Sequence, residues 1–99
     1  MTLALSRFKV ANGLEADVAR AFVNRPGLVE GAEGFLGLEV FTDGTDPSVF
    51  YLFTRWTSDS AFRQWHASEA HQVSHKGMPK GLKLDPAFTQ LVVMERVCG

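Results

Sequence analysis

The alternation of hydrophobic and polar residues predicts four strands. In residues 3–10 (LALSRFKV) hydrophobic residues stand on both alternating faces, which is typical of a strand with two partly covered sides. The runs 34–41 (GFLGLEVF) and 48–56 (SVFYLFTRW) flank TDGTDP, whose Asp, Gly and Pro residues favour a turn. They predict an antiparallel hairpin with a loop longer than the tightest type. Residues 87–97 (AFTQLVVMERV) predict the last strand.

A helix is predicted between the first and second strands. Residues 13–25 (GLEADVARAFVNR) carry hydrophobic residues three and four positions apart, as on one face of an amphipathic helix. Asn12 precedes this pattern and is expected to be its N-cap, and the Pro-Gly pair at 26 and 27 ends it.

A second helical region follows the hairpin. Ser58 or Thr57 is expected to cap it, and Asp59 stands in its first turn, where the helix dipole favours a negative charge. Ser68 is expected to restart the helix after a kink. Residues 76–88, with two glycines and two prolines, predict a loop.

The predicted order of strand, helix, strand, strand, helix, strand is that of a ferredoxin-like α+β fold. In this fold a four-stranded antiparallel sheet carries both helices on one face. Residues 1–99 form one domain of this kind. The run VFYLFTRW (49–56) is hydrophobic at nearly every position, so side chains on the open face also need a cover. A second copy of the chain is the simplest cover, and we expect a homodimer.

Composition and charge exclude several classes of partner. The formal net charge is -1 and no block of like charge occurs, so nucleic acid is not an expected partner. The amino-terminal stretch MTLALSRFKV has no long apolar run, which argues against a signal peptide or a membrane partner, and we expect a cytoplasmic protein. The single cysteine, Cys98, cannot form an internal disulfide and is expected to be inert.

Two stretches carry a more specific pattern. They are GFLGLEVF (34–41) and RWTSDSAFRQW (55–65), the latter with Trp56, Ser58, Ala61, Phe62 and Trp65. Together they resemble the antibiotic biosynthesis monooxygenase family, over nearly the whole chain and in the same order. The resemblance implies a dimeric α+β barrel, a pocket between sheet and helices on each subunit, and a monooxygenase activity.

The resemblance is sharper for the heme-degrading branch of this family. Its pocket combines an Asn on the first strand, a Trp on the second helical region and, about ten residues later, a His that ligates the iron. Trp65 and His75 match the last two, whereas Ser6 stands at the Asn position. This implies heme as substrate and cofactor, His75 as its iron ligand, Trp65 as the wall that distorts the ring, and an external electron donor. Ser6 is then a weakened distal group, because its hydroxyl is shorter and has one donor where the amide has two.

Further pocket residues follow from the same resemblance. Phe22 is expected as a pocket wall and Phe62 as a second ring near the ligand, although Phe62 alone also fits a helix core. Arg25 is either a partner for a carboxylate or a solvated charge at a helix end. The loop lysines either meet the heme propionates or keep the loop soluble; they are Lys76, Lys80 and Lys83.

Other readings of the histidines and of the function stay open. His75 alone also fits a solvent-facing helix end. His71 and His75 stand four apart, a spacing zinc can use, but a third protein ligand is missing from that face, so we expect no zinc site. Apart from heme degradation, the chain fits a cofactor-independent monooxygenase of a phenolic or quinol-like substrate. It also fits a non-enzymatic dimeric protein that binds heme or another small aromatic molecule.

Overall fold

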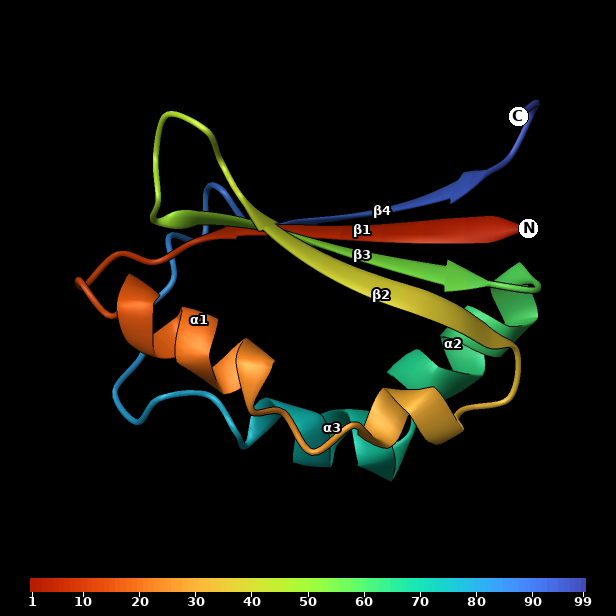
Figure 1. Ribbon diagram of the computed structural model, residues 1–99, viewed down its shortest axis with the longest axis horizontal. Coiled ribbons are helices and arrows are strands. Elements are labelled where there is room, and N and C mark those ends of the chain that lie inside the picture. Colours follow the sequence, from red (N-terminus) through yellow and green to blue (C-terminus); the bar gives the residue numbers. More distant parts are fainter.

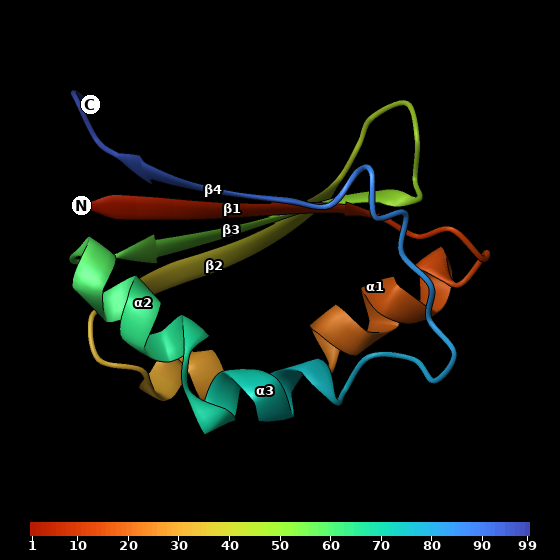
Figure 2. The same cartoon turned by 180° about the vertical axis from the view of Figure 1, so that it is seen from behind.

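Strands and helices form two layers (Figure 1). The computed structural model describes residues 1–99. The elements, in order, are β1 (Thr2–Lys9), α1 (Glu15–Val23), the 3-10 helix η1 (Leu28–Gly31), β2 (Phe35–Thr42), β3 (Val49–Trp56), α2 (Asp59–His66), α3 (Glu69–His75) and β4 (Gln90–Glu95). The four strands make one antiparallel sheet in the order β2-β3-β1-β4. All helices lie on one side of it, so the predicted ferredoxin-like α+β fold is confirmed (Figures 1 and 2).

The register of the central strands decides which side chains face the helices. In antiparallel pairs, residues directly opposite each other point to the same face. Ser6 of β1 is opposite Leu52 of β3 and Leu91 of β4. Ser6 shares its face of β1 with Ala4, which is buried in the core, so Ser6, Leu52 and Leu91 all face the helical layer.

The hydrophobic core is divided into two clusters at opposite ends of the sheet. The first cluster consists of Ala4, Val29, Trp56 and Phe62, and the second consists of Val10, Val18 and Phe50. In the first, Trp56 is fully buried and its indole Nε1 donates to Thr54 Oγ1 over 2.9 Å. In the second, the Phe8 and Phe50 rings stack at 5.3 Å. Each cluster fastens part of the helical layer to the sheet.

The kinked second helical region is confirmed with its two serine caps. Ser58 Oγ accepts from the Ala61 amide at 3.1 Å, and Ser68 Oγ accepts from the His71 amide at 3.2 Å. Each bond satisfies an amide that has no partner in the first turn of a helix. The helix therefore ends at His66 and restarts at Glu69.

The predicted N-cap of the first helix is wrong. The cap position is Leu14, and no side chain caps the helix. Gly13, with φ of 79°, turns the chain between Asn12 and the helix. Asn12 instead bonds the loop after α3: its Nδ2 donates to the Gly81 carbonyl at 2.7 Å, and its Oδ1 accepts from the Lys83 amide at 3.2 Å.

Other predicted boundaries move by a few residues. The first helix covers residues 15–23 of the predicted 13–25. The last strand begins at Gln90 because residues 85–88 form a turn, in which the Phe88 amide donates to the Asp85 carbonyl at 3.0 Å.

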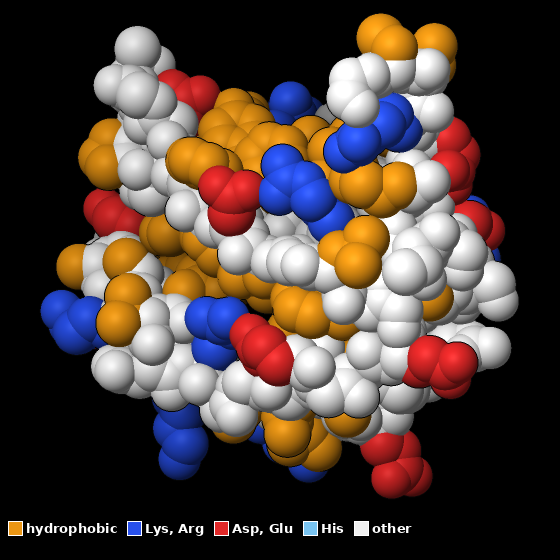
Figure 3. Space-filling view, turned by 45° about the vertical axis from the view of Figure 1, so that its right-hand side comes forward, with side chains coloured by type: hydrophobic (Ala, Val, Ile, Leu, Met, Phe, Trp, Pro, Cys, Tyr) orange, Lys and Arg blue, Asp and Glu red, His pale blue; other side chains and the backbone are white.

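The outer face of the sheet is hydrophobic and uncovered. The register places these side chains on it: Leu3, Leu5, Phe41, Tyr51, Phe53, Val92 and Met94. Phe41 is 50% exposed and packs edge-on against Phe53 at 5.6 Å. Figure 3 shows hydrophobic side chains gathered over the sheet at the top of the molecule, interrupted by charged ones. None of the helices is both long and apolar enough to cross a membrane.

Replacing Gly34 should destabilise the fold. Gly34 has φ of 82°, and an added Cβ would lie 2.6 Å from Ala61 Cβ and 2.6 Å from Thr57 Oγ1. Backbone strain and overpacking each cost about 1–3 kcal/mol, so Gly34→Ala should lower the free energy of unfolding by roughly 2–4 kcal/mol in urea denaturation. Gly44→Ala is the control, since its Cβ would meet nothing within 4 Å. Equal losses in the two variants would contradict this account.

Candidate functional site

The inner face of the sheet is buried at both ends and only partly buried in the middle. Ala4 and Trp56 at one end, and Val10 and Phe50 at the other, are almost wholly buried. Between them the line of side chains formed by Leu52, Ser6 and Leu91 keeps solvent contact, and Leu91 on the edge strand is 44% exposed. We call this region, between the two clusters and above Leu52, Ser6 and Leu91, the central gap. α3 lies opposite it in both ribbon views (Figures 1 and 2).

The predicted aromatic residues lie at the borders of the two clusters. Trp65 is half-buried and packs against the first cluster, while Phe62 is a buried member of that cluster, edge-on to Trp56 at 5.9 Å. Phe22 is half-buried at the second cluster, with its ring 6.1 Å from that of Phe50. These residues thus stand on both sides of the central gap. Their contact with a ligand stays a prediction.

The three histidines form a row of rings that sequence reasoning missed. The centroids of His66 and His71 are 4.7 Å apart, and those of His71 and His75 are 4.3 Å apart. His66 and His71 come together because the chain bends at Ala67 and Ser68, between α2 and α3. The Trp65 ring lies 5.7 Å from the His71 ring. The bend at Ser68 was the sequence signal that could have indicated this contact.

The three histidines differ in exposure along the row. His71 is half-buried, whereas His66 and His75 are exposed. Burial lowers the pKa of His71, and the neighbouring charges of His75 and His66 lower it further, while a hydrogen bond with the His66 backbone acts in the opposite direction. His71 is therefore neutral at pH 7. No three His, Cys, Asp or Glu side chains of the chain come together as a metal-ion site.

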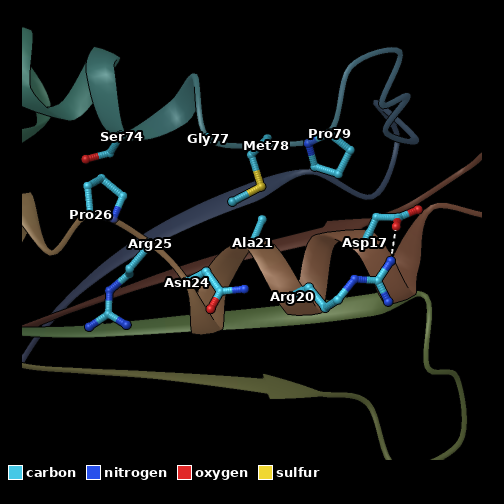
Figure 4. Close-up of a pocket in the computed structure, with 10 residues that line it drawn as sticks. All are labelled: Asp17, Arg20, Ala21, Asn24, Arg25, Pro26, Ser74, Gly77, Met78 and Pro79. Atoms are coloured by element: carbon cyan, nitrogen blue, oxygen red, sulfur yellow. Dashed lines mark hydrogen bonds and ion pairs between the residues drawn. The ribbon is translucent and has the colours of Figure 1, made fainter.

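Arg25 borders a cavity of about 400 Å³ between α1 and the end of α3 (Figure 4). The lining residues are Asp17, Arg20, Ala21, Asn24, Arg25, Pro26, Ser74, Gly77, Met78 and Pro79. Both arginines are already paired, Arg20 with Asp17 and Arg25 with Glu30. These pairs are exposed, so their exchange for another anion costs little. The loop lysines 76, 80 and 83 are exposed and take no part in an ion pair.

Trp65 borders a second cavity of about 310 Å³, between η1 and α2 and α3. Small and polar residues share its wall, namely Gly31, Ala32, Glu33, Ala61, Gln64, Ser68 and Ala70, together with Leu28. Neither cavity is lined by Ser6 or by any other residue of the sheet. The space that these two cavities enclose lies within the helical layer, whereas the sequence predicted a pocket between sheet and helices.

Known proteins are similar to this chain in sequence and in fold. A heme-degrading monooxygenase of Halalkalibacterium halodurans is 35% identical in an alignment 77 residues long, which covers 76% of this chain and 66% of that protein, just under two thirds of its length. The heme-degrader MhuD of Mycobacterium tuberculosis, solved with two hemes bound in its active site, superposes with a TM-score of 0.80 at 23% identity, over 100% of this chain and 98% of MhuD.

A cofactor-independent oxygenase has a similar fold. SnoaB of Streptomyces nogalater gives a TM-score of 0.78 at 15% identity, over 99% of this chain and 94% of SnoaB. The family described as "Antibiotic biosynthesis monooxygenase" matches residues 1–77. Since the match spans 77 of the 99 residues, the chain belongs to the antibiotic biosynthesis monooxygenase family.

Proposed function

We propose that the protein is a heme-degrading monooxygenase whose porphyrin lies in the central gap. The observation that supports this most is the division of the core, which leaves Ser6 and Leu52, in the middle of the inner sheet face, only partly buried between two buried clusters. Trp65 and the histidine row stand on the helical side of this region. The Halalkalibacterium relative is itself a heme-degrading monooxygenase.

The residues present fit a heme. Heme is a flat and largely apolar ring with two carboxylates, and Leu52 and Leu91 give the central gap an apolar floor that retains exposure. His75 is exposed, so its imidazole is free to reach a ligand. Arg25, exposed and paired only with Glu30, is a candidate partner for a propionate.

Each of these residues has a distinct role in the proposal. Bound heme would supply the iron at which oxygen is activated, with electrons from an external donor. His75 would hold the iron through an imidazole nitrogen, and Trp65, packed against the first cluster, would be a fixed wall for the ring. The Ser6 hydroxyl on the floor bonds to no other residue, so its single proton is available to a ligand. Phe22 and Phe62 lie on opposite sides of the central gap, Phe62 in the first cluster and Phe22 against the second.

A second candidate is a cofactor-independent monooxygenase of a phenolic or quinol-like substrate. The cavity beside Trp65 favours it, because about 310 Å³ suits a small aromatic molecule better than a porphyrin. In that reaction no iron ligand is needed, and the histidine row would be structural. Hemin binding distinguishes the two candidates.

His75→Ala should abolish the shifted Soret band that hemin gives with the wild-type protein. The reason is loss of the imidazole that would hold the iron, because the iron's ligand sets the spectrum of bound heme. Titration of hemin followed by absorbance measures it. His66→Ala is the matched control and should keep the band, because the His66 ring contacts His71, and it is His71 that contacts His75. Hemin that leaves the wild-type spectrum unshifted would instead favour the phenolic substrate.

Ser6→Asn should accelerate heme breakdown. The amide is longer and adds a donor at the floor of the central gap, where the serine hydroxyl is short. We expect slow breakdown by the wild-type protein with a reductant and oxygen, and about tenfold faster breakdown by the variant, equivalent to roughly 1.4 kcal/mol in the barrier. The loss of the Soret band over time measures the rate. Heme that persists in both forms would identify a heme-binding protein without turnover.

We also propose that a second copy covers the outer face of the sheet. The hydrophobic side chains there come from all four strands, with charged ones among them, and a two-fold related copy would bury them. Phe53→Glu places a charge near its centre and should give monomers in sedimentation velocity at micromolar concentration. Val23→Glu is the control, since Val23 on α1 is 80% exposed away from this face and the variant should sediment like the wild type. A stable, folded wild-type monomer would exclude the dimer.

A further inference from the structure

We propose that His71 is a positioning residue that fixes the imidazole of His75. The inference rests on the proposed function, in which His75 ligates the iron of a heme. It arises from the contacts of the two rings and from how little else holds His75.

His75 has few restraints of its own. It is the last residue of α3 and is exposed, and its side chain makes no hydrogen bond within the protein. Its aromatic contact is with His71, whose ring lies 4.3 Å away at an interplanar angle of 66°. A histidine at a helix end with no other partner would otherwise sample several rotamers.

His71 is anchored where His75 is not. It is half-buried, and its ring contacts Trp65 edge-on at 5.7 Å as well as His66 at 4.7 Å. Trp65 packs in turn against the first cluster. Contacts therefore run from the buried core through Trp65 and His71 to His75. They link Trp65, the proposed wall for the porphyrin, to His75, the proposed iron ligand.

The orientation of a ligating histidine matters for affinity. A metal-ligating imidazole is normally held by a partner on its other side, and loss of that partner typically costs 10–100-fold in metal affinity. The packing of His71 takes the place of such a partner here. His71→Ala should therefore weaken hemin binding about tenfold while the spectrum still depends on His75. His71→Phe keeps an aromatic ring at the position and should restore affinity to within about twofold.

The experiment has one arm without hemin and one with it. In the first, ¹H–¹³C NMR records the His75 imidazole, which His75→Ala identifies by its absence. In His71→Ala the signal should move towards that of a free exposed histidine, because the ring current of His71 is lost. In His71→Phe it should stay displaced, and in the control His66→Ala it should stay near the wild-type position. In the second arm, hemin is titrated into the same four proteins and the wild type.

The outcomes separate this proposal from the proposed function. An unchanged His75 signal in His71→Ala overturns the positioning role whether or not hemin binds. Equal hemin affinity in His71→Ala and the wild type, or failure of His71→Phe to restore it, overturns it as well. If the NMR signals behave as expected but the wild type binds no hemin, His71 does position His75 and the proposed heme chemistry is what fails.

Discussion

The arrangement of this molecule depends on two separate hydrophobic contacts between helices and sheet. Val18 and Phe62, which are both buried, fasten α1 and α2 to opposite ends of the inner face. Burial of each such side chain contributes about 1.5–3 kcal/mol, and neither cluster extends to the middle. The helical layer is thus held at its two ends, while Ser6 and Leu52 between them stay only partly buried. A single continuous core would have buried more hydrophobic surface but would also have covered Ser6.

The fold was predictable because its signals are local and repeated. Alternation marks the strands, and the serines at 58 and 68 carry hydroxyls that the first turn of a helix requires, so both caps were found. Asn12 was misassigned because the same side chain that caps a helix also bonds any nearby backbone amide and carbonyl. The partners that Asn12 bonds lie in a loop about seventy residues further along the chain, and the sequence around Asn12 gives no sign of them.

The site was predictable only in part, for a similar reason. Trp65 and His75 could be named as candidates because they match the family resemblance at a spacing of ten, and the structure places them at the two ends of one run of ring contacts. For the middle member, His71, the spacing of four places it beside His75, but its contacts with Trp65 and His66 arise from the bend at Ser68 and were not predicted. The two helical cavities were likewise not predictable, since they depend on how η1 and α1 lie against α3.

The bonds of Asn12 also limit how the cavity beside Arg25 can open. Residues 76–88 would be a long free loop, but the Val10–Leu84 bridge and the Asp85 amide, bonded to the Lys9 carbonyl at 2.9 Å, hold its far half to the end of β1. The Met78 amide donates to the His75 carbonyl at 3.2 Å, and Asn12 bonds Gly81 and Lys83, so both ends of the short segment 77–80, which includes cavity wall, are held. A short segment has few conformations to lose, so ordering residues 77–80 over the cavity costs little entropy. On its loop side, any opening of this cavity is thus confined to a few residues held at both ends.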